Sequence, residues 1–282
     1  LRASGYTGTV FPFIYPPLWA WLASWAVQVM EYETLLSGVR IVNAVLLLVA
    51  AVGLALFIRT ESHATSPLIR LALFRDPVLR TSLTMSGLVA TVVMATLVVG
   101  PFYLGLALRL DTAMVGAVMS AGPIAAALTG VPAGRIVDRF GAQRATLLGL
   151  VGMALGCFAL AMLPESWGIA GYVVPMVVAT SSYALFQTAN NTAVMADVSP
   201  ETRGVVSGML NLSRNLGLIT GASVMGAIFA VASGTVAFAS ADPAVIAVGM
   251  RTTFAVAVVL VLTALLAAAT SQVVARNLPS TG

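Results

Sequence analysis

Long apolar stretches alternate with short polar links along this chain, and the pattern predicts membrane-spanning helices. About twenty apolar residues are enough to cross the hydrocarbon layer of a bilayer. Eight stretches are long enough: residues 10–30, 39–58, 81–104, 112–133, 145–163, 168–190, 203–232 and 250–273. The expected fold class is therefore an all-α membrane protein.

The amino-acid composition also indicates a protein that lies in a lipid bilayer. Hydrophobic residues make up 59% of the 282 positions and charged residues only 9%. A soluble protein of this size would have a less apolar composition. All 14 basic residues are arginine, and nearly all of them are scattered between the apolar stretches. Because they form no continuous basic stripe, membrane lipids are the expected surroundings and no nucleic-acid partner is expected.

The distribution of arginine predicts the orientation. Alternate links carry ten arginines, namely Arg2, Arg59, Arg70, Arg75, Arg80, Arg135, Arg139, Arg144, Arg203 and Arg276. The other links carry three, Arg40, Arg109 and Arg251. Since arginine is enriched on the cytoplasmic side, both ends of this chain are expected in the cytoplasm, with the bundle in a bacterial inner (plasma) membrane.

The N-terminal region allows more than one interpretation. Prolines crowd the start of stretch 10–30 and tryptophans its middle, so it either crosses the membrane or lies at the interface. Residues 59–80 form the longest polar link, which is either a connector at the membrane surface or a lipid-sensing helix. Residue 1 is leucine and no signal-peptide pattern follows, so a fragment of a longer chain is expected.

The link between the fourth and fifth stretches holds the most informative motif. It reads Gly-Arg-Ile-Val-Asp-Arg-Phe-Gly-Ala-Gln-Arg over residues 134–144. Its anchors are Gly134, Asp138, Arg139, Gly141 and Arg144. Gly134 would let two helices approach closely and Gly141 would tolerate a positive φ. Asp138 can accept hydrogen bonds from helix N-terminal amides, while the arginines lie at the lipid headgroups. An ordinary positive cytoplasmic loop is the alternative.

This spacing resembles the major facilitator superfamily signature, G-x-x-x-D-R-x-G-x-(R/K)-(R/K), which joins the second and third helices of each six-helix half. Gln143 is the one departure. Residues 200–217, continuing to Gly221 and Gly226, resemble the fifth helix of the C-terminal half in drug:proton antiporters with fourteen spans. The resemblance implies that residues 78–282 form a C-terminal six-helix half. Residues 1–77 would be two linker helices with a cytoplasmic connector, and an N-terminal six-helix half would be the partner.

Two apolar stretches carry polar side chains at helical spacing. The sixth has Thr180, Tyr183, Gln187, Asn190 and Asn191 on one face. An unpaired amide in hydrocarbon costs a few kcal/mol, so this face should line a water-filled cavity or bond to another helix. A cavity is favoured for Tyr183 and Gln187, and both interpretations stay open for Asn190 and Asn191.

The seventh stretch places Ser207, Asn211 and Arg214 within a narrow arc, with Asn215 beside them. Counted from a helix cap at Ser199, Arg214 lies roughly 20 Å along the axis at about 1.5 Å per residue. Because a guanidinium at such depth costs at least about 2.5 to 3.5 kcal/mol, it should face the bundle interior. The Arg214 side chain either lines the cavity as a cation or gate, or is held in place by hydrogen bonds to carbonyls and Asn side chains of neighbouring helices. The glycines that follow should allow close helix packing.

Groups for enzymatic chemistry are scarce. His63 and Cys157 are the single histidine and cysteine, so neither a metal site nor a Ser-His-Asp arrangement can be assembled, and no enzyme, metal or cofactor is expected. No carboxylate falls in the middle of a span, so a proton-carrying group would belong to the N-terminal half.

The expected function is secondary active transport, in which two six-helix bundles rock around a central site for a small-molecule substrate. The resemblance implies proton-coupled efflux of amphiphilic drugs or toxic compounds. The same architecture could import a small polar solute, and a truncated, non-transporting membrane remnant is a further alternative.

Overall fold

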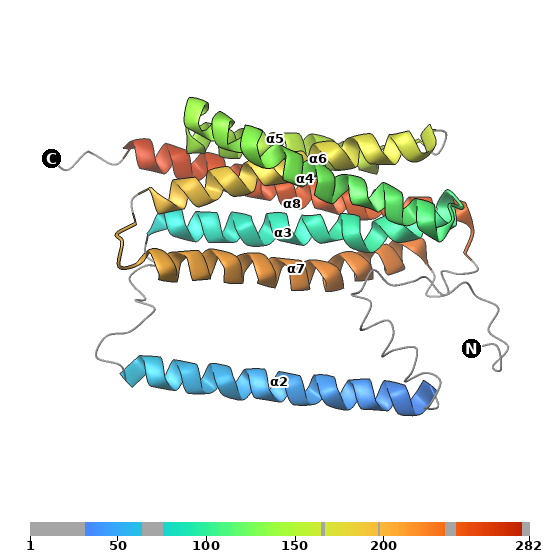
Figure 1. Ribbon diagram of the computed structural model, residues 1–282, viewed down its shortest axis with the longest axis horizontal. Helices are drawn as coiled ribbons and strands as arrows, with labels where there is room; N and C mark the ends of the chain where they lie inside the picture. Colours follow the sequence, from blue (N-terminus) through green and yellow to red (C-terminus); the bar gives the residue numbers. More distant parts are fainter. Residues whose placement is uncertain (1–31, 64–75, 165–166, 197, 235–240, 278–282) are drawn as a thin grey trace. The chain divides into compact units, whose positions relative to one another are not determined.

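The computed structural model describes residues 32–63, 76–164, 167–196, 198–234 and 241–277. Every regular element among them is helical, with no strand in these ranges, which confirms the all-α fold class (Figure 1). The chain divides into two compact units, Leu1–Arg70 and Leu71–Gly282, and each is considered by itself. The expected span 10–30 and most of the connector lie outside the described residues.

The first unit contains helix α2, Tyr32–His63. This helix includes the expected span 39–58 and is longer at both ends, so Arg40, expected in a link, lies within the helix. Its continuous apolar part among the described residues is Ala44–Gly53. Membrane crossing by α2 and its role as a linker helix stay predictions.

The second unit contains six helices that are each long and apolar enough to cross a membrane. They are α3 (Pro77–Phe102, continued by the π-helical turn η3, Tyr103–Ala107), α4 (Thr112–Phe140), α5 (Ala142–Ala161), α6 (Gly168–Met195), α7 (Arg203–Ser233) and α8 (Pro243–Asn277). All six of the spans expected after residue 78 are present. In this unit α3 packs against α7 and α8, α5 against α6 and α8, and α4 against α6 (Figure 1).

Local capping explains where two of these helices begin. An Asp76 oxygen accepts a hydrogen bond from the Val78 amide (2.9 Å), with Pro77 as the first helical residue. Asp111 likewise accepts from the Met114 amide (2.7 Å). Short carboxylates at the N-cap satisfy amides that have no partner inside the helix, so both starts follow directly from sequence.

Two expected boundaries were wrong. With the cap expected at Ser199, α7 would begin at Pro200, but it begins at Arg203. The amides of Thr202 and Arg203 both donate to the Ser199 carbonyl in a preceding turn. Arg251 was expected in a link but lies inside α8, which already begins at Pro243. Its Nε donates to the Leu163 carbonyl (3.1 Å), and this bond gives the charged side chain a partner at that position.

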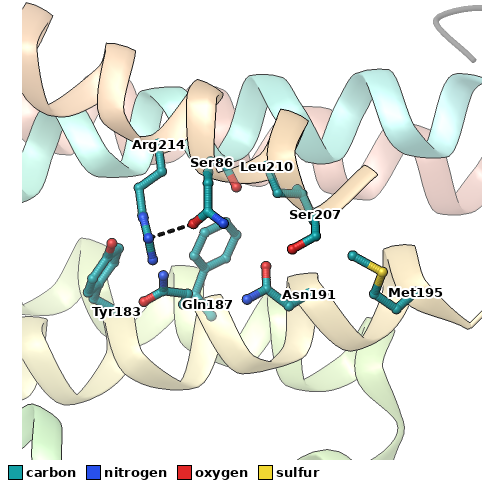
Figure 2. Close-up of a pocket in the computed structure, with 10 residues that line it drawn as sticks. Ser86, Tyr183, Gln187, Asn191, Met195, Ser207, Leu210 and Arg214 are labelled. Atoms are coloured by element: carbon teal, nitrogen blue, oxygen red, sulfur yellow. Dashed lines mark hydrogen bonds between the residues drawn. The ribbon is translucent and has the colours of Figure 1, made fainter. Parts of the chain in front are cut away.

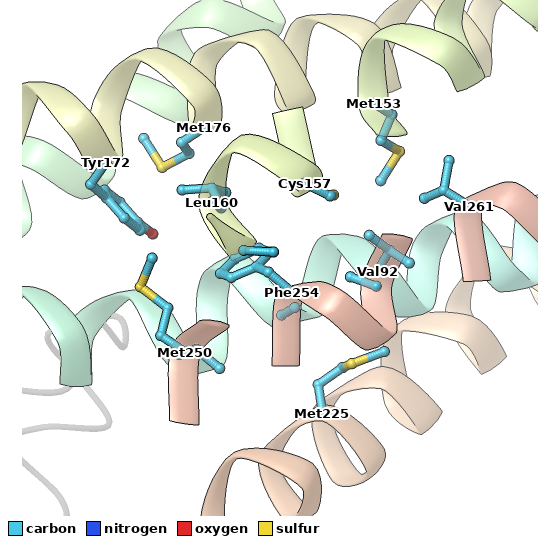
Figure 3. Packing of buried hydrophobic residues seen from close by; sticks show 14 of the residues in the cluster. Val92, Met153, Cys157, Leu160, Tyr172, Met176, Met225, Met250, Phe254 and Val261 are labelled. Carbon is cyan, nitrogen blue, oxygen red and sulfur yellow. The ribbon is translucent and has the colours of Figure 1, made fainter. Parts of the chain in front are cut away.

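The core of the second unit lies among all six of its helices, α3 to α8 (Figure 3). Its largest fully buried side chains include Tyr172, Phe254, Met225 and Leu160. Figure 3 shows Met250 and Phe254 of α8 pointing toward α5 and α6. This packing fixes the positions of α6 and α7, the two helices that carry the polar stripes.

Close contact between α3 and α7 depends on glycine. A Cβ atom at Gly217 would collide with the Gly87 backbone, and one at Gly221 with the Thr91 backbone. Thr91 Oγ1 also donates to the Gly217 carbonyl (3.0 Å). The close packing expected for Gly217 and Gly221 is confirmed, whereas a Cβ at Gly226 would have no neighbour nearer than Val98 Cγ1 at 3.6 Å.

Gly217→Ala should therefore destabilise the bundle by about 1 to 3 kcal/mol, the usual range for overpacking. Thermal unfolding of purified protein in detergent measures the change. Gly208→Ala is the matched control on the same helix, because a Cβ there meets no atom within 4 Å and alanine has the better helix propensity. Equal melting temperatures for the two variants would contradict the role of close packing.

Candidate functional site

A polar groove lies between α6 and α7 of the second unit, with α3 contributing one side chain (Figure 2). Its volume is about 210 Å³. The lining residues are Ser86 of α3, Tyr183, Phe186, Gln187, Asn191 and Met195 of α6, and Ser207, Leu210, Asn211 and Arg214 of α7. The groove thus brings together side chains from both stripes predicted from sequence.

On the α6 side, Tyr183, Gln187 and Asn191 follow one another at intervals of four residues and point toward α7 (Figure 2). This spacing places them on one face of the helix. Phe186 and Met195 add apolar surface to the same wall. The α6 wall therefore offers hydroxyl and amide groups together with apolar contact area.

Asn190 and Asn191 separate into different environments. The Asn190 side chain is buried, with 1% of its surface exposed, and it does not line the groove. Its Nδ2 donates to Ser86 Oγ (3.1 Å) and to the Ser82 carbonyl (3.4 Å) on α3. Asn190 thus joins two helices, whereas the neighbouring Asn191 is exposed to the groove.

On the α7 side, Arg214 points across the groove toward Tyr183 and Gln187 (Figure 2). Its Nη2 donates to Asn211 Oδ1 one turn earlier (2.7 Å). Because α7 begins at Arg203, Arg214 lies roughly 17 Å into the helix, slightly less than expected, at about 1.5 Å per residue. Asn215, the other candidate on this helix, is exposed and outside the lining.

The Arg214 charge has no counter-ion in the described part of the chain. Its hydrogen-bond partner there is the neutral amide of Asn211, and no lining residue is acidic. The bond to Asn211 holds the guanidinium in place without neutralising it. Most of its five N–H donors remain available for a ligand.

The signature segment is largely helical and is not the open link expected from sequence. Residues 134–140 form the last two turns of α4, and Gly141 alone separates α4 from α5. Gly141 has φ = +82°, which confirms the expected positive φ. The sharp break between two continuous helices depends on this one glycine.

One other expectation for this segment was wrong within the described chain. A Cβ at Gly134 would meet no atom within 4 Å, so Gly134 mediates no close helix contact here. Asp138 is exposed and accepts no hydrogen bond from the described residues, so its expected binding to helix N-terminal amides stays a prediction. Arg139 lies over the Phe140 ring at 5.5 Å from its centroid, and Arg144 is exposed in the first turn of α5.

Ser86 was not identified from sequence, although it contacts both the groove and Asn190. Ser82 and Ser86 lie one turn apart on a largely apolar helix. That spacing is the signal that would have found them, because two hydroxyls on one helical face require polar neighbours. In the described ranges no group of three metal-ligating side chains comes together.

Substituting the two adjacent asparagines should separate stability from transport. Asn190→Ala removes two bonds between α6 and α3 and should lower the free energy of unfolding by about 1 to 3 kcal/mol. Asn191→Ala should leave unfolding unchanged and reduce transport by the complete protein. Thermal unfolding and a transport assay on both variants provide the comparison, and the reverse assignment of effects would contradict it.

Comparison with known proteins identifies the family to which the chain belongs. Residues 4–222 match the family model described as Major Facilitator Superfamily. The chain is 31% identical over 188 residues to the uncharacterized transporter YebQ of Escherichia coli, covering 67% of this chain and 41% of YebQ. It is 23% identical to the multidrug efflux pump LfrA of Mycolicibacterium smegmatis (73% and 40% covered) and 32% identical to the drug efflux pump JefA of Mycobacterium tuberculosis (66% and 37%).

A crystal structure of the nucleoside transporter NupG shares the fold, with a TM-score of 0.60 at 18% identity, covering 71% of this chain and 50% of NupG. The chain spans about two fifths of the length of the curated relatives above. The family match covers well over half of the chain and agrees with the six apolar helices. The chain therefore belongs to the major facilitator superfamily.

Proposed function

We propose that this chain is the C-terminal part of a secondary active transporter that exports small amphiphilic compounds. The observation that carries the proposal is the groove between α6 and α7, where three helices place hydroxyls, amides and a guanidinium inside an otherwise apolar bundle. Holding such groups within a membrane bundle is unfavourable, so they mark a substrate pathway more readily than a packing contact. Relatives named as drug efflux pumps support export.

The partner in this proposal is an N-terminal six-helix half. Helices α4 and α7 expose large apolar side chains, among them Leu128, Leu216 and Ile219. These surfaces face lipid or a second bundle, and rocking of two bundles would open the central site to each side in turn. Residues 1–77 would then supply the two linker helices of a fourteen-span protein.

Proton coupling requires a carboxylate that changes protonation, and none lines the groove. Glu201, just before α7, is exposed, and hydrogen bonds from its own backbone amide and from Ser199 lower its pKa. It therefore stays ionised near neutral pH and is unsuited to carry a proton. The proposal places the titrating carboxylate in the N-terminal half.

Efflux is tested by expressing the complete gene in a bacterium that lacks its main efflux pumps. Cellular accumulation of a panel of amphiphilic dyes should fall, and a protonophore should restore it. Accumulation that rises on expression would instead identify an importer. Unchanged accumulation and unchanged growth inhibition across the panel would count against transport of this class.

Orientation is tested by cysteine labelling. In the proposed topology Gln143→Cys lies in the cytoplasm and Ala244→Cys outside, at opposite ends of the bundle. An impermeant thiol reagent added to intact cells should label only Ala244→Cys, and the buried native Cys157 gives little background. Labelling of Gln143→Cys in intact cells would overturn the orientation.

A further inference from the structure

The groove has an unbalanced charge. Of its lining residues Arg214 alone is charged, and the groove provides no carboxylate to pair with it. The described acidic residues of this unit, Asp76, Asp111, Asp138, Glu201 and Asp242, lie at helix ends or in links, and none lines the groove. A ligand in this groove therefore meets a positive potential.

The neutral lining also suits an anionic oxygen group. Tyr183 and Gln187 face Arg214 across the groove, so their hydroxyl and amide can donate to a group held by the guanidinium (Figure 2). Arginine binds a carboxylate through two parallel N–H bonds, and such a pair is stronger inside a bundle than in water. Phe186, Leu210 and Met195 provide apolar contact beside these donors.

We propose that the groove selects its ligands by charge: it binds amphiphiles that carry a carboxylate or similar anionic oxygen group, which pairs with the Arg214 guanidinium, and it disfavours the corresponding esters and cations. Asn211 acts as a positioning residue, because its carbonyl oxygen holds Nη2 while the other donors remain directed into the groove. The inference depends on the proposed function, in which this groove lies on the substrate pathway.

The test compares dyes that differ in one carboxylate. Rhodamine 110 carries a free carboxylate and rhodamine 123 is its methyl ester; further aromatic carboxylates and their methyl esters extend the panel. Transport by the complete protein is measured in inside-out vesicles. The wild type should transport the carboxylate member of each pair with the lower KM. Arg214→Gln should raise the KM of the carboxylate about tenfold and leave that of the ester unchanged or lower, because the carboxylate loses a charge pair whereas a cationic ester loses only a repulsion.

Two variants control for charge and folding. Arg214→Lys keeps the positive charge and should retain most of the preference, although it lacks the planar fork. Arg80→Gln removes an exposed arginine at the start of α3, outside the groove, and should leave the preference intact.

The outcomes distinguish this inference from the function on which it rests. An equal loss of transport for acid and ester in Arg214→Gln, or a wild-type preference for the esters, would overturn charge selection while export stands. Transport of no pair by the wild type would count against the proposed function itself.

Discussion

Replacing Arg214 with alanine should reduce transport of carboxylate substrates by the complete protein at least about tenfold, which corresponds to about 1.4 kcal/mol of lost transition-state stabilisation. The side chain is the only charge lining the groove, and its partner Asn211 is neutral. Folding should not suffer, because removing a guanidinium from the membrane interior relieves an insertion cost of at least about 2.5 kcal/mol.

The measurement is substrate efflux at matched expression, beside thermal unfolding of the purified variant. Arg80→Ala is the control for loss of one arginine outside the groove. Normal efflux by the Arg214 variant would show that Arg214 has no role in transport and acts only through its hydrogen bond to Asn211. A large loss of stability, with expression falling in parallel, would also favour this structural role of Arg214.

Asp138→Asn should shift the complete protein away from its outward-facing state. The carboxylate is exposed and unpaired within the described chain. The resemblance to the facilitator signature implies that it contacts the cytoplasmic start of the fifth helix of the other half and so holds the outward-facing state. A charge–dipole contact is worth about 0.3 to 1 kcal/mol, or up to about 2 when partly buried, which changes a population several-fold to about thirtyfold. The fold of this chain should be unaffected.

The shift in population is measured by the thiol reactivity of Ala244→Cys, on the proposed external side, together with substrate efflux. Asp138→Glu keeps the charge and should change reactivity less than Asp138→Asn. If reactivity and efflux both stay at their wild-type values in Asp138→Asn, the signature acts only through its positive charges at the cytoplasmic surface.

In the second unit, the sequence predicted the number of spans better than their ends. An apolar stretch marks only the part of a helix that lies in the hydrocarbon layer, whereas the helix itself can continue into the headgroup region. Helix α4 was expected to end at residue 133 but continues through Arg135, Asp138 and Arg139 to Phe140. These charged residues are compatible with helix geometry, and only the positive φ of Gly141 ends it.

Within the groove, periodicity predicted which helix faces are polar but not what each side chain contacts. Asn190 and Asn191 differ by one position, about 100° around the helix, and both fit the stripe. Their environments depend on Ser82 and Ser86 of α3, more than a hundred residues away in sequence. A pattern within one helix cannot specify a neighbour on another helix. The structure was therefore needed to decide which asparagine lines the groove and which one binds another helix.

The central claim is that the groove between α6 and α7 lies on the substrate pathway, and substrate protection of a groove cysteine tests it most directly. Ser207→Cys is nearly isosteric and lines the groove, whereas Gly208→Cys lies one residue further along α7, outside it. In the complete protein, a saturating transported compound should slow thiol labelling of Ser207→Cys and leave labelling of Gly208→Cys unchanged. Equal labelling of Ser207→Cys with and without that compound, while transport proceeds, would contradict the claim.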